Sequence, residues 1–302
     1  MTEEFCDVGR GVTLCYETFG DPADPPILLI MGLATQMIAW HEDFCAELAE
    51  RGFYVVRFDN RDIGRSTHFD FSPPSIPQML LRRLPPEQYS LSDMAEDCAV
   101  LIRELGIAPV HVVGASMGGM IAQMLAAEHS DLVRSLTSIM ATTGNRWRGQ
   151  PTFSVYSYLL KPPPADREGY IQRSAEVFGL VGSPGFERDE QYVRERAAKS
   201  YDRGYDVRAG ARQLGAIVAS GDRTKSLKGI AAPTLVIHGT DDKMVRPSGG
   251  RATARAIPGA RLMMVDGMGH DLPRGVWTRI IDAISEHARA ADGSRARAEA
   301  PA

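Results

Sequence analysis

Short apolar runs alternate with segments of helical spacing along the first part of the chain. Residues 12–19 alternate in character, residues 27–31 are a continuous apolar run, and residues 53–58 (FYVVRF) are apolar apart from Arg57, so three strands are predicted there. The first of them reads as a leading edge strand. Apolar side chains at residues 40–51 recur at helical spacing, which predicts a helix between the second and third strands. A strand, helix, strand unit results.

The same rhythm continues to residue 140. A helix capped by Ser90 or Ser92 is expected to end near Gly106, because its apolar positions recur every three or four residues. The elements expected after it are a strand at 110–113, a helix at 117–128 and a strand at 132–140. Strands that alternate with helices in this way predict an α/β fold whose mainly parallel sheet is covered by helices on both faces.

The pattern changes between residues 142 and 227, where Pro, Tyr, Arg and Glu become frequent and only helical fragments at 167–178 and 187–200 are predicted. We expect this segment to be a mostly helical cap. It interrupts an α/β core made of residues 1–141 and 228–290, whose strand and helix order resumes at 233–238, 249–256, 260–265 and 273–289. The remaining residues, 291–302, are expected to form a disordered tail.

Composition excludes several classes of protein. The 302 residues are 44% hydrophobic and 24% charged, with no apolar run near the roughly 20 residues that a membrane span needs. A net charge of −4 argues against a nucleic-acid surface, and the acidic start MTEEFCDVGRG does not resemble a secretory signal, so a cytoplasmic location is expected. The four cysteines lack metal-ligand spacing, which suggests neither a zinc site nor a disulfide framework.

The segment VHVVGASMGGMIAQ carries the strongest chemical signal, a G-x-S-x-G motif formed by Gly114, Ser116 and Gly118. A strand is predicted before it and a helix after it, which is the setting of a nucleophile elbow. Such a turn holds the serine in a strained conformation above the carboxyl ends of the strands. The motif could also be a plain helix start capped by Ser116. A phosphate loop is excluded, because no lysine follows in the GK[ST] position.

A serine nucleophile needs a base and a group that orients the base, and this type of fold places them in the order Ser, acid, His. The strand TLVIH is followed by GTDDKMVRP, which offers Asp241 and Asp242, and the strand RLMMV is followed by DGMGHDLP, which offers His270. Both loops lie at the same sheet edge as Ser116, so the three side chains can converge. Alone, each could be a turn residue or a surface histidine; their joint order favours a triad.

Attack by the serine creates an oxyanion that needs backbone donors already in place. The N–H groups of Met117 and Leu33 are the candidates, because the first follows the nucleophile and the second follows Gly32 in the loop after the strand ILLIM. An ordinary strand-to-loop turn would also explain this sequence. Met37 and Met244, together with Leu33 and Met117, could offer apolar substrate contacts, although methionines more often belong to the core.

With these residues in view, the chain resembles the α/β-hydrolase superfamily over nearly its full length. The segments GDPADPP, MGLATQMIAWHEDF, RFDNRDIGRSTHFD, HVVGASMGG and GMGHDLP resemble aclacinomycin methylesterase-like proteins and an actinobacterial lipase and esterase group. The resemblance implies ester hydrolysis, and in some relatives thioester or phospholipid hydrolysis. Its G-x-x-D pattern implies that the acid is Asp242 and leaves Asp241 to the turn. The loop after Met140, another placement of the acid, holds no carboxylate.

Two positions depart from the resembled family. Met31 precedes Gly32 where many members have His, so only the backbone role carries over. Asp62 stands where the loop RFDNRDIGRS usually has Gly, and we assign it a structural role ahead of a substrate contact.

The predicted activity is cleavage of a carboxylic ester by Ser116, His270 and Asp242, without a metal or another cofactor. The ester could be a small molecule, a lipid or a thioester. Alternatives on the same fold are a perhydrolase or haloperoxidase-like activity and a serine aminopeptidase. The aminopeptidase would need acids in the cap, such as Glu187, Asp189 and Glu190. A catalytically silent ligand receptor is the alternative that is not an enzyme.

Overall fold

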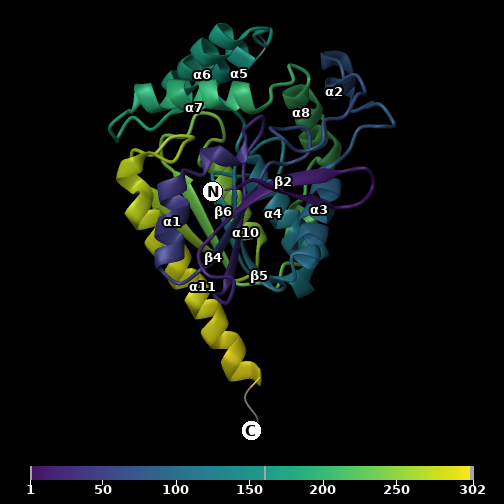
Figure 1. Ribbon diagram of the computed structural model, residues 1–302. Helices are drawn as coiled ribbons and strands as arrows, with labels where there is room; N and C mark the ends of the chain where they lie inside the picture. The colour runs from purple at the N-terminus through teal and green to yellow at the C-terminus, as the bar shows by residue number, and fades with distance from the viewer. Residues whose placement is uncertain (1, 160, 300–302) are drawn as a thin grey trace.

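The computed structural model describes residues 2–159 and 161–299, and its centre is one mixed sheet (Figure 1). The strand order is β1-β2-β4-β3-β5-β6-β7-β8. β1 pairs with β2, and β2 pairs with β4, in antiparallel orientation. All pairs from β4 to β8 are parallel. The strands are β1 Glu4–Asp7, β2 Thr13–Phe19, β3 Pro26–Ile30, β4 Tyr54–Phe58, β5 Val110–Ala115, β6 Val133–Ile139, β7 Thr234–Gly239 and β8 Arg261–Val265. This confirms the predicted mainly parallel α/β sheet.

The sheet edge differs from the expectation. Residues 12–19 were expected to form the edge strand, but β1 pairs outside β2 and takes that position. The strand β1 has only four residues and no continuous apolar run, so no periodicity marks it in the sequence.

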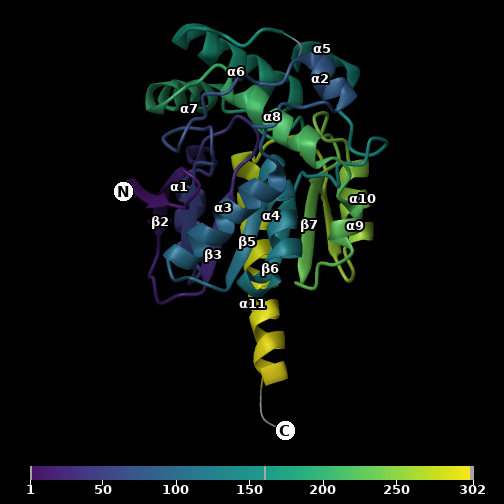
Figure 2. The same cartoon turned by 90° about the vertical axis from the view of Figure 1, so that its right-hand side faces the viewer.

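Two hydrophobic clusters fill the two faces of the sheet, and period-two alternation separates them. Leu28 and Ile30 of β3 face a cluster with helices α3 Leu91–Glu104 and α4 Met117–Glu128. Ile27 and Leu29 face the other cluster, with α1 Glu42–Glu50 and α11 Trp277–Glu299. Figure 2 shows α3 and α4 on the near face and α11 behind the sheet. Ser90 caps α3 by accepting a hydrogen bond from the Asp93 N–H.

Between β6 and β7 the described chain is helical and contains no strand. Its helices are α5 Phe153–Leu159, α6 Arg167–Val181, α7 Glu190–Arg203, α8 Ala209–Ser220 and α9 Thr224–Leu227. The fragments predicted at 167–178 and 187–200 correspond to α6 and α7. We call residues 142–227 the insertion. Its helices α5 to α8 lie at the end of the molecule opposite the C-terminus, together with the unpredicted short helix α2 Ile76–Leu81 (Figures 1 and 2).

The last helix is longer than expected. Residues 291–302 were expected to be a disordered tail, but α11 continues to Glu299, and residues 300–302 lie outside the described part of the chain. Ala and Arg, frequent here, are strong helix formers. Asp292 also lies 3.3 Å from both the Arg134 and His111 side chains, which attaches this part of the helix to the sheet. No helix in residues 2–159 and 161–299 has the length and apolar character needed to cross a membrane.

Candidate active site

Ser116 lies at the junction of β5 and α4 in a strained backbone conformation. Its φ of 56° and ψ of −120° are unusual for a residue with a side chain. A Cβ atom at Gly114 would lie 2.2 Å from the Gly118 carbonyl oxygen, and one at Gly118 would lie 2.1 Å from the Ile30 carbonyl oxygen. Both positions therefore need glycine, and the turn projects Ser116 from the carboxyl end of the sheet.

The structure brings Ser116, His270 and Asp242 together. His270 Nε2 lies 2.9 Å from Ser116 Oγ, and His270 Nδ1 lies 2.8 Å from Asp242 Oδ2. The serine follows β5, the aspartate follows β7 and the histidine follows β8, so parallel strands present all three at one edge. The imidazole thus lies in hydrogen-bonding distance of both a hydroxyl and a carboxylate.

Asp242 is held on both of its oxygens. Its Oδ1 atom accepts hydrogen bonds from the backbone N–H groups of Met244 at 2.9 Å and Val245 at 2.8 Å, which leaves Oδ2 to His270. Burial by itself would raise the pKa of this carboxyl. The charge of His270 and hydrogen bonds from His238 and His270 outweigh burial and lower the pKa of Asp242 to about 2. The group is therefore a carboxylate at neutral pH.

The neighbouring Asp241 points elsewhere. Its side chain is exposed and accepts a hydrogen bond from Thr240 Oγ1 at 2.8 Å, while its backbone N–H donates to the Met268 carbonyl. Among the described residues, Asp242 is the one of these two carboxylates that contacts the imidazole. Asp241 holds the turn.

The backbone of the loop after β3 passes beside the serine. A Cβ atom on Gly32 would lie 3.1 Å from Ser116 Cβ, so glycine allows this approach. The Gly32 carbonyl accepts from the Thr35 N–H at 3.3 Å, and because a trans peptide directs its C=O and N–H to opposite sides, the Leu33 N–H points away from Thr35. Met117 begins α4 directly after Ser116, where the first N–H groups of a helix have no partner within it.

Groups of the insertion form hydrogen bonds with the loop after β3 and with the loop after β8. Gln213 of α8 is fully buried; its Oε1 accepts from the Ala34 N–H at 2.8 Å and its Nε2 donates to the Arg61 carbonyl at 2.8 Å. The His270 N–H donates to the Val181 carbonyl at 2.7 Å, and the Gly269 N–H donates to Ser183 Oγ at 2.8 Å. No motif marks Gln213 or Ser183 in the sequence, because their partners lie more than 80 residues away.

The predicted apolar contacts have different positions. Met37 is fully buried and packs with Cys15 and Ile38, so the structure gives it a core position instead of a surface on a substrate pocket. Met244 is half-buried, and its N–H group orients Asp242. Met117 is fully buried and Leu33 is partly exposed.

The acids considered for binding a substrate amine have other partners or are exposed. Asp189 caps α7 by accepting from the Tyr192 N–H, and Glu190 pairs with Arg194 at 3.1 Å. Glu187 is exposed in the segment before α7. The three carboxylates therefore lie on the outside of the insertion.

Asp62 joins the core to the insertion. It is fully buried with a φ of 70°, a left-handed conformation in which glycine is favoured and aspartate is tolerated. Arg212 of α8 donates to it at 2.7 Å, and the Tyr89 hydroxyl donates at 2.7 Å. Asp62, His68 and Asp206 bring ligand atoms within 4.8 Å of one another. Because Arg212 also pairs with Asp206, we interpret this cluster as an ion-pair network.

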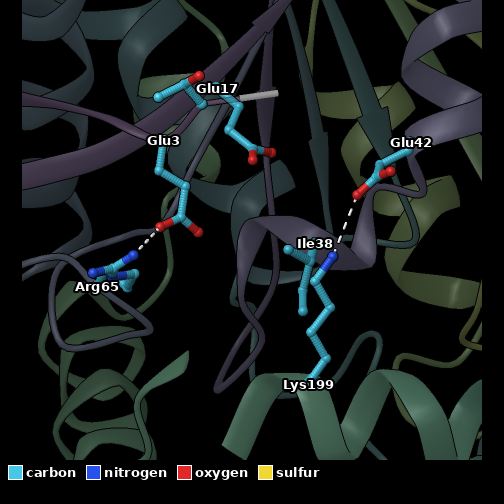
Figure 3. A pocket seen from close by; sticks show the side chains of 7 residues that line it. Glu3, Glu17, Ile38, Glu42, Arg65 and Lys199 are labelled. Atoms are coloured by element: carbon cyan, nitrogen blue, oxygen red, sulfur yellow. Dashed lines mark hydrogen bonds and ion pairs between the residues drawn. The ribbon is translucent and has the colours of Figure 1, made fainter. Parts of the chain in front are cut away.

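A separate hollow lies where the N-terminal strands and α1 meet α7 (Figure 3). Figure 3 shows two ion pairs across it, one from Arg65 to Glu3 and one from Lys199 to Glu42, the latter at 3.3 Å. Four of its five charged side chains thus form two ion pairs across it, and the fifth, Glu17, pairs with Arg57.

Comparison with known proteins gives a consistent result. The family model described as alpha/beta hydrolase fold matches residues 25–273. Rhodomycin D methylesterase DauP of Streptomyces sp. (strain C5) is 31% identical over 301 residues, which cover 93% of this chain and 96% of that protein. Non-heme chloroperoxidase CPO-A1 of Kitasatospora aureofaciens is 25% identical over 280 residues, covering 88% and 92%. The enol-lactonase of Burkholderia xenovorans LB400 has a similar structure, with a TM-score of 0.73, 23% identity and coverage of 94% and 99%.

Proposed function

Because the chain belongs to the alpha/beta hydrolase fold family, we propose that it is a carboxylic ester hydrolase with Ser116 as nucleophile, His270 as general base and Asp242 as the orienting acid. The observation that carries the proposal is the position of His270, whose ring nitrogens lie 2.9 Å from Ser116 Oγ and 2.8 Å from Asp242 Oδ2. This geometry matches what a serine nucleophile needs for activation.

In the first half of the reaction, Ser116 Oγ attacks the ester carbonyl carbon while His270 Nε2 takes the hydroxyl proton. The negative charge moves to the carbonyl oxygen, where the Leu33 and Met117 N–H groups are our proposed donors. As the tetrahedral intermediate collapses, the carbon–oxygen bond to the alcohol breaks and His270 gives the proton to the leaving alkoxide. Asp242 stabilises the imidazolium formed in between.

The second half repeats these steps with water. His270 takes a proton from a water molecule that attacks the acyl-serine, and the collapse of the second intermediate returns the proton to Ser116 Oγ. The products are a carboxylic acid and a free enzyme. Every proton in the cycle is carried by the imidazole, so the steps use only this chain, the ester and water.

For the substrate, we propose an ester of a small alcohol, methyl esters included. The support is the 31% identity to a protein named rhodomycin D methylesterase over 93% of this chain. Lipid esters and thioesters would pass through the same acyl-enzyme. They therefore belong in the same assay.

A second candidate is perhydrolysis, in which hydrogen peroxide in place of water attacks the acyl-serine. The observation that favours it is the 25% identity to a protein named non-heme chloroperoxidase. An aminopeptidase has less support, because Asp189 and Glu190 are engaged in a helix cap and an ion pair. A silent receptor would leave the strained conformation of Ser116 without a use.

The proposal is tested by turnover of p-nitrophenyl esters from acetate to palmitate, with methyl esters, thioesters and aminoacyl anilides alongside. We expect esters to be cleaved, and Ser116→Ala to reduce turnover by about 10⁴-fold to 10⁶-fold while the protein remains folded. Acid release in water without peroxide separates hydrolysis from perhydrolysis. Ester turnover that survives Ser116→Ala would contradict the mechanism.

A further inference from the structure

The exposed apolar side chains are concentrated around the insertion. Of the ten large hydrophobic residues exposed in the described chain, three lie on or beside α2 and three lie on or before α5. Leu80 is 80% exposed, Trp147 is 73% exposed and Phe153 is 87% exposed. We call the group the apolar patch; it consists of Ile76, Leu80, Leu81, Trp147, Phe153 and Tyr156.

The two halves of the apolar patch share one end of the molecule. Figures 1 and 2 both place α2, α5 and α8 at the end of the molecule opposite the C-terminus. Gly221 at the end of α8 lies between them: a Cβ atom there would be 2.8 Å from Arg82 Nη1, and one at Gly144 would be 2.1 Å from the Gly221 carbonyl oxygen. The segments are therefore neighbours in space.

Cations outnumber acids around the apolar patch. Residues 71–86 and 141–165, which contain it, hold no Asp or Glu. They contain five cations: Arg82, Arg83, Arg146, Arg148 and Lys161. Within the described residues none of the five forms an ion pair. Two acids beside this surface, Asp222 and Glu176, accept hydrogen bonds from Asn145 and from Tyr158.

The opposite side of the insertion shows that unpaired cations are not general here. On α6 and α7, Arg167 pairs with Asp202, Arg194 with Glu190 and Lys199 with Glu42. The apolar patch is thus a distinct surface, apolar at its centre and cationic around it.

We propose that the apolar patch docks on an anionic lipid surface. Leucine and aromatic side chains enter the boundary between headgroups and acyl chains, and arginines contact the lipid phosphates. A second copy of this chain fits less well, because a twofold interface would place the same unpaired cations opposite each other. The proposal goes beyond the ester hydrolase function and does not rest on it.

Docking would bring the proposed active site close to the lipid. The Thr152 N–H, directly before α5, donates to the Lys243 carbonyl at 2.9 Å, and Lys243 follows Asp242. The segment before α5 is therefore connected to the loop that carries the acid by this hydrogen bond and by the one from Arg246 Nε to the Gln150 carbonyl at 2.8 Å.

The test is co-sedimentation of the full chain with vesicles of phosphatidylglycerol or of phosphatidylcholine. We expect binding to phosphatidylglycerol that weakens as salt is added, and weaker binding to phosphatidylcholine. The double change Leu80→Glu with Phe153→Glu should reduce binding about tenfold or more. Arg82→Gln with Arg83→Gln should remove the preference for phosphatidylglycerol. The matched control is Leu262→Glu, which changes an exposed leucine on β8 and should leave binding unchanged.

Thermal unfolding of each variant checks that these exposed substitutions leave the fold intact. Absence of vesicle binding by the wild-type chain, or equal loss with Leu262→Glu, would overturn the proposal. So would a concentration-dependent dimer in sedimentation velocity that Leu80→Glu with Phe153→Glu abolishes, since the patch would then bind a second copy.

Discussion

The strand-end loops and the insertion contribute to the candidate site in different ways. The loops after β5, β7 and β8 supply Ser116, Asp242 and His270, and each follows its strand within a few residues. The insertion supplies no member of this group. Instead, its groups hold the loops: Gln213 binds the Ala34 N–H, and the Val181 carbonyl binds the His270 N–H.

The reacting groups therefore lie on the strand-end loops, whereas the groups that align those loops lie on the insertion. A reacting group must sit at the edge where parallel strands end, so its position follows from strand order. A group that aligns a loop needs only a buried polar atom in reach, and any nearby segment can provide it. Changes of the three reacting side chains should therefore abolish turnover, whereas changes in the insertion should weaken turnover or stability.

The largest effect that sharpens the comparison concerns the two adjacent carboxylates. Asp242→Asn keeps the shape but offers the wrong hydrogen-bonding pattern to His270, and we expect turnover to fall by about 10³-fold to 10⁴-fold. Asp241→Asn is the matched control. It should cost less than about tenfold, because Asn replaces Asp well in turns. Steady-state kinetics on one p-nitrophenyl ester would reveal a misassigned acid if Asp241→Asn proved the more damaging change.

A large effect on stability is expected where the insertion meets the core. Arg212→Met removes the cation that pairs with the fully buried Asp62 and should lower the free energy of unfolding by about 3–5 kcal/mol. Arg167→Met breaks an exposed ion pair of the same chemistry on α6 and should change the free energy of unfolding little. Urea unfolding of both variants measures the contrast, and similar values for the two would remove the distinction between these contacts.

A smaller effect on turnover is expected from Gln213→Met. The Ala34 N–H loses its acceptor one residue after the proposed donor Leu33, so the loop loses alignment without losing a donor itself. Removal of a direct oxyanion donor lowers kcat by about 10²-fold to 10³-fold. Loss of loop alignment alone should have a smaller effect, so we expect Gln213→Met to lower kcat by about tenfold with little change in KM. Gln172→Met on the exposed face of α6 is the control. A change in KM alone would assign Gln213 to substrate binding instead.

The smallest effect concerns the core at the far side from the site. Burial lowers the pKa of His287, so the unfolded chain binds more protons than the folded one below about pH 6.5, the ordinary value for histidine. The free energy of unfolding should therefore be highest above that pH and fall as the pH drops towards the folded pKa. His287→Gln, which can still donate to the Pro233 carbonyl, should show a smaller fall. Equal pH dependence in both proteins would exclude His287 as a source.

The core could be predicted from the sequence because its signals are local. The helix expected at residues 117–128 is α4 with the same bounds, since a buried strand and small residues precede it. The strands β3, β4, β5, β7 and β8 contain short apolar runs, and β6 has apolar positions at Val133, Leu136 and Ile139. By contrast, α2, α5 and α8 have no such regular pattern, and β1 is too short to show one.

Some residues of the candidate site could be predicted from the sequence and others could not. Ser116, Asp242 and His270 each follow a recognisable strand, so their convergence could be predicted from the order of the strands. Gln213 could not be predicted, because one glutamine on a helix has no pattern that names a partner 179 residues away. Asp62 could be noticed in the sequence because it replaces a glycine, but its contact with Arg212 could be recognised only in the structure.

The central claim is that Ser116 is an activated nucleophile, and labelling with a fluorophosphonate probe tests it most directly. Peptide mapping by mass spectrometry should find the phosphonyl adduct on Ser116 in the wild-type chain and in Asp241→Asn. Labelling should be lost in Ser116→Ala and strongly slowed in Asp242→Asn, because an unassisted serine is a poor nucleophile. An adduct on another residue, or unchanged labelling of Ser116→Ala, would contradict the account.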